Sequence, residues 1–240
     1  RISILMPFRN TAAFLEECLT SIRSQSYKNW EVVAVNDHSE DASKTLMKKA
    51  ALADSRIRVL DNAGTGIIPA LRQAYAAPSG ELITRMDSDD RMSPDRLETM
   101  AGELIRNGQG HLALGLVKYF SDAGVSDGYA RYEKWLNGLS ASGDNFSEIY
   151  KECVIPSPCW MVWRQDLDQS GAFLPDLRLS LVLVACGSTL AAMAVLLKLL
   201  SGRQAEAEKA LAASDPAAAL SALEDAHPRE SSILAAVVRY

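Results

Sequence analysis

Short apolar segments and amphipathic segments alternate over the first 118 residues of this 240-residue chain, and this alternation constrains the fold more than any other feature. The apolar segments are rich in β-branched residues, as strands are, and the segments between them carry apolar residues at helical spacing. Strands are predicted at 2–6, 30–35, 57–60, 82–86 and 111–118, and helices at 14–22, 42–53, 68–77 and 94–107. Strands that alternate with helices at this spacing pair in parallel, so the pattern predicts an α/β fold with a mostly parallel sheet flanked by helices.

The rest of the chain is less regular. Residues 119–176 carry aromatic side chains among glycines and serines, and we expect them to complete a substrate cleft. Leu179–Leu197 carries no charge and is long enough to cross a bilayer or to form a fully buried helix. Residues 201–240 are rich in alanine, leucine and glutamate, which predicts short helices resembling one helical repeat. The expected parts are therefore a domain over 1–176, an apolar helix over 177–200 and a helical tail over 201–240.

The net charge limits the expected binding partners of the chain, and the cysteine pattern indicates its redox compartment. The net charge of −5 offers no basic surface, so no nucleic-acid partner is expected. The four cysteines are scattered without the spacing of metal ligands, and this usage fits a reducing cytoplasm.

Polar clusters follow three of the predicted strands, at 7–10, 36–41 and 87–90. Ligands of an open parallel sheet bind beyond the carboxyl ends of its strands, so the clusters are expected to form one site. If Asp87-Ser88-Asp89 is extended, its two carboxylates point the same way and suit Mg²⁺ or Mn²⁺ that also binds a diphosphate. The alternative interpretation of this triplet is a polar loop that precedes a helix starting at Pro94.

The second cluster and a glycine-containing loop add further candidates. Asp37 follows an apolar strand and is placed to accept hydrogen bonds from a base or ribose, or else to form an Asx-turn. His38 is interpreted as a turn residue. The loop 62–66 is suited to approach a ligand closely, although it lacks the spacing of a P-loop or of a dinucleotide fingerprint.

These motifs occur in a characteristic order. In sequence they are Met6-Pro7-Phe8-Arg9-Asn10, then WEVVAVNDHS over 30–39, Gly80-Glu81-Leu82-Ile83, and Asp87-Ser88-Asp89-Asp90. The series resembles family 2 glycosyltransferases of the GT-A fold over about residues 1–118, and more loosely to Pro175. The resemblance implies a UDP- or GDP-type sugar donor, transfer with inversion at the anomeric carbon, and Mn²⁺ or Mg²⁺ as cofactor.

The resemblance also implies roles for individual residues. Asp37 is expected to hold the base, Asp87 the ribose side of the nucleotide and, with Asp89, the metal. The other implied donor-binding residues are Pro7, Phe8, Arg9, Asn10, Gly66, Arg72 and Ser88. A polysaccharide, lipid-linked or other hydroxyl acceptor is implied, as in cell-wall or polysaccharide biosynthesis, and Trp160 and Arg164 are candidates for the acceptor side. The expected location is the cytoplasm, with the cytoplasmic face of the inner membrane as the alternative if 179–197 tethers the chain there.

The chain departs from the family's pattern where the catalytic base is expected. Members usually carry an acidic pair shortly after a Gly-x-Phe segment. Here Gly171-Ala172-Phe173 is followed by Asp176 and then by Leu177-Arg178-Leu179, so Asp176 is the candidate base. Three explanations stand: a genuine fusion with a membrane helix, a reading-frame or assembly error that replaced the end of the domain, and a buried soluble helix that completes the fold.

Two other functions compete with an active glycosyltransferase. The missing acidic pair favours a catalytically inactive nucleotide-sugar-binding or scaffolding protein. A sugar-phosphate nucleotidyltransferase shares the α/β plan, but it would be expected to carry a glycine-rich loop after the first strand, and residues 7–10 contain no glycine.

Overall fold

The computed structural model describes residues 1–121, 124–148, 152–173 and 237–238. The chain divides into two compact units, each with its own internal contacts. The first comprises Arg1–Gln109 with Ser157–Gln165, and the second comprises Gly110–Pro156 with Asp166–Tyr240. Every residue that the sequence nominates for the site belongs to the first unit, except Asp176, which lies outside the described residues.

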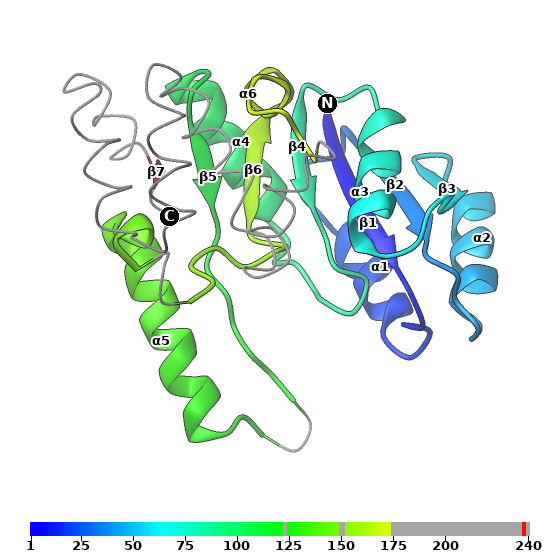
Figure 1. Cartoon of the computed structure of the whole chain (residues 1–240), viewed down its shortest axis with the longest axis horizontal. Helices are drawn as coiled ribbons and strands as arrows, with labels where there is room; N and C mark the ends of the chain where they lie inside the picture. The colour runs from blue at the N-terminus through cyan, green and yellow to red at the C-terminus, as the bar shows by residue number, and fades with distance from the viewer. Residues whose placement is uncertain (122–123, 149–151, 174–236, 239–240) are drawn as a thin grey trace, which may run out of the picture. The chain divides into compact units, whose positions relative to one another are not determined.

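The first unit is built on a twisted sheet with strands in the order β3-β2-β1-β4-β6 (Figure 1). Its strands are β1 (Ile2–Phe8), β2 (Trp30–Asn36), β3 (Ile57–Asp61), β4 (Leu82–Arg85) and β6 (Trp160–Trp163). The first four run parallel to one another, and β6 pairs antiparallel with β4. The predicted α/β fold with a mostly parallel sheet is therefore confirmed.

The central strand β1 continues through Pro7 to Phe8, so the strand predicted at 2–6 is two residues too short. The carbonyl of Leu5 accepts a hydrogen bond from Met86 N (3.0 Å), on the side of β4. Alternate residues face the same neighbour, so the nitrogen of Pro7 also faces that side. Pairing with β4 ends at the Leu5–Arg85 pair, so the missing N–H of Pro7 removes no hydrogen bond from the sheet.

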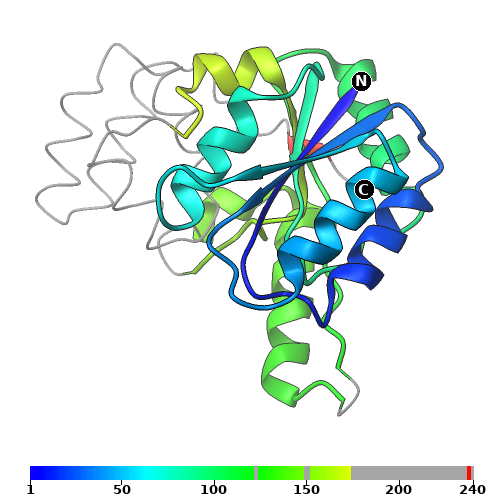
Figure 2. The same cartoon turned by 90° about the vertical axis from the view of Figure 1, so that its right-hand side faces the viewer.

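The helices of the first unit cover both faces of its sheet. They are α1 (Leu15–Arg23), α2 (Ser43–Ala53), α3 (Ile67–Ala76) and α4 (Arg96–Asn107). Helices α1 and α2 lie on one face and α3 on the other (Figure 2). This arrangement explains why every residue of β1 and β2 is buried and why these strands lack polar alternation.

Helix α4 begins at Arg96, two residues later than the Pro94 that the sequence predicts. The reason is Gln25, two residues after the end of α1, whose side-chain amide nitrogen donates to Ser93 O (2.6 Å). Its amide oxygen accepts from Leu97 N (3.0 Å), and so supplies the cap that the helix's own residues do not provide. Pro94 O is used in turn by Ser26 N (2.8 Å), and both carbonyls are therefore held outside the helix.

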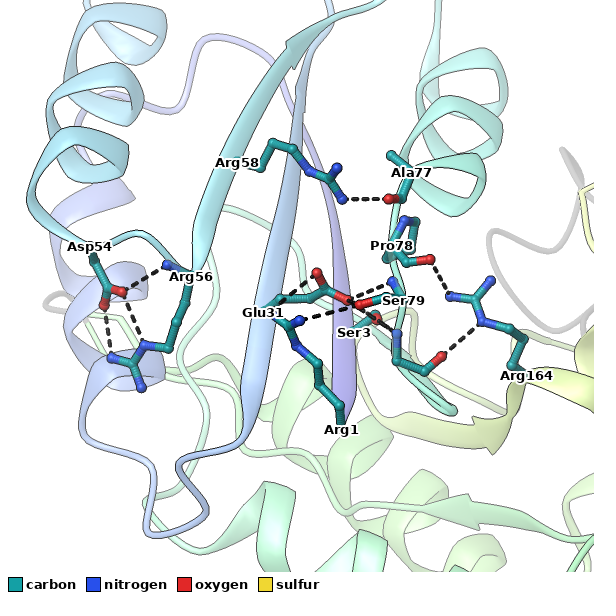
Figure 3. Close-up of polar contacts among 11 residues, drawn as sticks. Arg1, Ser3, Glu31, Asp54, Arg56, Arg58, Ala77, Pro78, Ser79 and Arg164 are labelled. Atoms are coloured by element: carbon teal, nitrogen blue, oxygen red, sulfur yellow. Dashed lines mark hydrogen bonds and ion pairs between the residues drawn. The ribbon is translucent and has the colours of Figure 1, made fainter.

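The buried carboxylate of Glu31 lies at the amino ends of these strands and connects them by hydrogen bonds (Figure 3). Glu31 accepts hydrogen bonds from Ser3 Oγ (2.7 Å), Ser79 N (2.8 Å) and Gly80 N (3.1 Å), and pairs with Arg1 at 3.5 Å. Burial raises the pKa of Glu31, but these hydrogen bonds and the Arg1 charge outweigh it and leave that pKa below its usual value. Gly80 is required here because a Cβ would lie 2.4 Å from Ser3 Oγ.

The second unit contains a helix where the sequence predicts an irregular stretch. Helix α5 spans Asp127–Ser142; the Ser126 side chain caps it, and Gly143 ends it in a left-handed conformation (φ 80°). The strand predicted at 111–118 is shorter, because β5 covers only Leu112–Leu114. Both backbone groups of Val117 pair with the side chain of Asn137 on α5, at 2.9 and 2.8 Å, which holds this segment on the helix.

The remaining described elements are short. They are η1 (Asn145–Glu148), α6 (Arg164–Gln169) and β7 (Val237–Val238), which pairs in parallel with β5. Of the tail expected to be helical, only this two-residue strand is described. Among the described residues, no helix is both long and apolar enough to cross a membrane, and Leu179–Leu197 lies outside them.

Candidate functional site

The sheet register places three strand ends at one level. Phe8 at the end of β1 pairs with Asn36 at the end of β2, and Asn36 pairs with Asp61 at the end of β3. On the other side of β1, Leu5 pairs with Arg85, the last residue of β4. After β1 the chain forms β2 on one side of that strand, and it later forms β4 on the other side of β1. This change of direction creates the switch point where open α/β sheets bind ligands.

Hydrogen bonds join the loop after β1 to the loop after β2. Asn10 adopts a left-handed backbone (φ 53°), which asparagine tolerates better than most residues. The four bonds between the loops are Asn10 N to Ser39 Oγ (3.2 Å), Glu40 N to Asn10 Oδ1 (2.8 Å), Thr11 N to Ser43 Oγ (2.8 Å) and Ala12 N to Asp41 Oδ2 (3.0 Å). The two loops therefore form one connected edge of the site.

Asp37 is buried beside the loop that follows β3. Its Oδ1 accepts hydrogen bonds from Asn62 Nδ2 (2.7 Å) and Gly66 N (3.0 Å), and its Oδ2 shares the Gly66 donor at 3.1 Å. Gly66 has a φ of 93°, which a side chain would strain. His38 also has a left-handed backbone (φ 55°), and its Nε2 donates to Gly64 O at 2.7 Å. His38 is thus more than a turn residue, because it ties the loop 62–66 to the loop after β2.

The acidic triplet forms a turn, and the expectation that it is extended is wrong. Asp90 N donates to Asp87 O (3.2 Å), and the Ser88 hydroxyl lies 2.9 Å from that of Thr11. Asp87 is partly buried, and its Oδ1 receives both Nε (2.8 Å) and a terminal nitrogen (2.7 Å) of Arg85. Asp89 is exposed, and the described residues offer its carboxylate no polar partner.

Burial and mutual repulsion make this turn electrostatically unusual. Burial raises the pKa of Asp87 although the Arg85 guanidinium opposes the shift. Burial, followed by the carboxylates of Asp87 and Asp89, raises the pKa of Asp90 to about 6. Beneath the turn, burial, followed by the carboxylates of Asp90, Asp89 and Asp87, raises the pKa of the Cys18 thiol to about 12. Clustered carboxylates of this kind favour a bound cation, which would relieve their repulsion.

The available ligands restrict how a metal ion can be held. The described residues contain no group of three His, Cys, Asp or Glu side chains that could hold one. Asp89 offers its whole carboxylate and Asp87 only Oδ2, since Arg85 takes Oδ1. Mg²⁺ and Mn²⁺ accept few protein oxygens when a diphosphate supplies the others. The site therefore fits a divalent cation that binds together with a nucleotide.

Comparison with known proteins decides the family. Residues 3–171 match the family described as Glycosyl transferase family 2. The chain belongs to this family.

Two relatives and one solved structure illustrate the family likeness. The chain is 33% identical over 158 residues to Glycosyltransferase GlyA of Streptococcus pneumoniae, covering 63% of this chain and 22% of the relative. It is 33% identical over 107 residues to the Escherichia coli UDP-Glc:alpha-D-GlcNAc-diphosphoundecaprenol beta-1,3-glucosyltransferase WfgD, covering 44% of this chain and 42% of the relative. The chain therefore spans less than half the length of these relatives.

The solved structure shares the fold. It is the mannosyltransferase PcManGT from Pyrobaculum calidifontis in complex with GDP-Man and Mn²⁺, with a TM-score of 0.59 over 98% of this chain and 72% of that chain. Its sequence identity is 17%, so this likeness shows the GT-A fold alone.

Within this family 2 domain, the other residues nominated for the donor lie in different settings. Pro7 and Phe8 are buried within β1, and Arg9 is exposed directly after it. Arg72 lies on α3, which begins directly after Gly66.

The two residues nominated for the acceptor side lie at opposite ends of β6. Trp160 is buried at the end adjoining the acidic turn, and its carbonyl accepts from Thr84. Arg164 lies at the other end, where its guanidinium donates to Gly80 O (2.8 Å) and Pro78 O (3.2 Å) (Figure 3). The structure does not bring Arg164 to the acidic turn.

Three residues of the site are not predicted from the sequence, although the position of each in the sequence indicates a site residue. Arg85 is a charge at the end of an apolar strand, two residues before Asp87. Asn62 directly follows another strand. Asp90 extends the acidic triplet. Polar residues at strand ends were therefore the informative class, including those outside recognised motifs.

Proposed function

We propose that this chain provides the donor-binding part of an inverting glycosyltransferase. The donor is a nucleotide-diphosphate sugar of UDP or GDP type, and the transferred group is a hexosyl unit. One observation carries the proposal: Asp37 and the Asp87–Asp90 turn follow strands that end on the same side of one sheet, and hydrogen bonds connect the loops that hold them.

The roles follow from the geometry of each carboxylate. Asp37 uses Oδ2 to accept a hydrogen bond from the nucleotide's base, because Oδ1 is already bonded to Asn62. Asp89 and Oδ2 of Asp87 hold the cation on the diphosphate, because Arg85 occupies Oδ1 of Asp87. A bound Mn²⁺ or Mg²⁺ supplies Lewis-acid stabilisation of the charge that grows on the leaving diphosphate. Ser88 anchors the turn through Thr11, which keeps the carboxylates in place. The exposed Arg9 provides a positive charge at the end of β1 for the same leaving group.

The acceptor we propose is a carbohydrate or lipid-linked hydroxyl, as the name of WfgD indicates for that relative. The described cysteines Cys18, Cys153 and Cys159 are thiols, as in a reducing compartment, which supports the cytoplasm. We place the reaction at the inner face of the membrane if the acceptor is lipid-linked. Trp160 is the remaining candidate for the acceptor side, because the described residues offer its buried indole N–H no hydrogen-bond partner.

Isothermal titration with UDP and GDP, with and without Mn²⁺, tests donor binding. Asp89→Ala should lose the Mn²⁺-dependent part of the affinity. Asp95→Ala is the matched control, because Asp95 is an exposed aspartate a few residues further along whose side chain caps no backbone group. Failure of a folded wild-type chain to bind either nucleotide would contradict the proposal.

A catalytically inactive nucleotide-sugar-binding protein is the second candidate. The sequence favours it because Leu177-Arg178-Leu179 stands where the family's acidic pair is expected. Donor hydrolysis separates the two, because an active enzyme should release free sugar slowly from the donor in the presence of Mn²⁺. If hydrolysis occurs, Asp176→Asn tests the candidate base, because loss of turnover with unchanged nucleotide affinity is the signature of a base.

A further inference from the structure

The side chain of Asn62 makes three hydrogen bonds, and all of them converge on Asp37 and the loop 62–66. Its Nδ2 donates to Asp37 Oδ1 (2.7 Å) and to Gly66 O (3.1 Å), and its Oδ1 accepts from Gly64 N (3.0 Å). Its backbone N–H donates to Asn36 O (2.9 Å), so the residue is also anchored to β2. Asn62 is only 4% exposed, which excludes a purely surface role.

These bonds determine the orientation of the amide. Both hydrogens of Nδ2 are used, and a flip of the amide would turn its oxygen towards the Asp37 carboxylate. The amide therefore acts on Asp37 in one way only, as a donor to Oδ1.

The consequence for Asp37 is an unequal use of its two oxygens. Oδ1 receives two donors, Asn62 Nδ2 and Gly66 N, and these match its two lone pairs. Oδ2 shares only the Gly66 donor, at 3.1 Å, and the described residues provide it with no other. The described residues therefore leave one lone pair of Oδ2 without a donor.

An open carboxylate oxygen discriminates between nucleobases by charge. Uracil and guanine present an imino N–H at the centre of their pairing edge, which can donate to it. Cytosine and adenine present an unprotonated ring nitrogen there, and its lone pair is repelled by a carboxylate. Discrimination requires that the carboxylate stay in one orientation, because a rotating group aligns with its ligand only part of the time.

We propose that Asn62 is a positioning residue for base selection, holding Asp37 so that Oδ2 alone reads an imino N–H on the donor's base. This inference rests on the proposed function. The substitution that tests it is Asn62→Ala, because it removes the donor to Oδ1.

The matched control is Gln73→Ala. Gln73 holds the other side of the same loop, accepting from Ala63 N (2.9 Å) and donating to Asp61 O (2.6 Å), and no bond links it to Asp37. A loss of loop order alone should therefore affect both variants, whereas a loss of carboxylate orientation should affect only Asn62→Ala.

The measurement is the affinity of the full chain for UDP, GDP and CDP in Mn²⁺, with thermal unfolding recorded on each variant. The quantity compared is the ratio of the affinity for the preferred nucleotide, UDP or GDP, to the affinity for CDP. We expect Asn62→Ala to lower this ratio about tenfold and Gln73→Ala to leave it unchanged. An equal ratio in the wild type and Asn62→Ala overturns the inference while nucleotide binding stands. An equal loss in both variants also overturns it, since loop order would then be the cause. Absence of nucleotide binding by the folded wild type removes the proposed function, and this inference with it.

Discussion

Arg85 places two nitrogens on a single oxygen of Asp87, with Nε at 2.8 Å and a terminal nitrogen at 2.7 Å from Oδ1. The arginine side chain is 7% exposed and the aspartate side chain 24%. The geometry neutralises a partly buried carboxylate and leaves only its other oxygen for a ligand. Arg85 therefore belongs to the candidate site although it touches no proposed ligand.

Arg85→Ala should destabilise the protein, because it leaves Asp87 partly buried without its cation. We expect the free energy of unfolding to fall by about 3 kcal/mol, measured by denaturant titration at neutral pH. Arg91→Ala is the control, because Arg91 pairs with Glu17 at an exposed position, and its loss should cost about 0.5 kcal/mol or less. The double variant Arg85→Ala with Asp87→Asn should recover part of the loss. Equal stability of that double variant and Arg85→Ala would contradict the assignment.

Asp90 should make the unfolding free energy depend on pH in a defined direction. Its folded-state pKa of about 6 lies above the ordinary value of 3.8, so protonation favours the folded state. This contribution is fully present below pH 3.8 and is lost as the pH rises through about 6. Asp90→Asn stays neutral, so its stability advantage over the wild type should grow between these limits and level off at about 1 to 2 kcal/mol.

The measurement is denaturant unfolding of both proteins from pH 4 to pH 8 in the absence of divalent cations. A difference that stays constant with pH would show that Asp90 does not titrate in this way. Asp95→Asn serves as the control, because Asp95 is exposed and its exchange should change the unfolding free energy little.

Gly80→Ala should be strongly destabilising at the amino end of the sheet. The new Cβ would lie 2.4 Å from Ser3 Oγ, 2.8 Å from Ser3 N and 2.9 Å from Arg1 O, and two of these atoms are backbone. We expect a loss of about 2 to 3 kcal/mol in unfolding free energy. Gly102→Ala is the opposite case, since Gly102 lies inside α4 with nothing near its Cβ position. That variant should gain about 0.5 to 1 kcal/mol, and thermal unfolding of the two side by side checks both signs.

Two substitutions of His38 should separate the contribution of its side-chain hydrogen bond to stability from the cost of its left-handed backbone. His38→Ala removes the hydrogen bond to Gly64 O and keeps a side chain in the left-handed region. His38→Gly removes the same bond but relieves the backbone. We therefore expect His38→Gly to be the more stable of the two by about 1 kcal/mol, as judged by denaturant unfolding. The reverse order would mean that the loop changes conformation when the histidine is lost.

The strands of the first unit were predictable because strands buried on both faces consist mainly of consecutive apolar residues. The runs in β1 and β2 are mostly apolar and buried at every position, and their bounds agree with the predicted ones within two residues. Helix α5 was missed because only Leu136 and Ser140 of it are buried, so it lacks a continuous apolar stripe. The local cap signals, Ser126 and Gly143, were present but were not enough without periodicity.

The sequence by itself determined the alternating α/β plan, the family, and which carboxylates stand at strand ends. These properties depend on local pattern and on the order of residues along the chain. Only the tertiary structure decided how each carboxylate is used: Asp87 is turned to Arg85, Asp37 is held by Asn62, and Asp89 is left open. The Asn62–Asp37 contact joins two different loops, and a turn rather than an extended segment orients the acidic triplet. Distances between loops and the direction of a carboxylate arise only when the chain is packed.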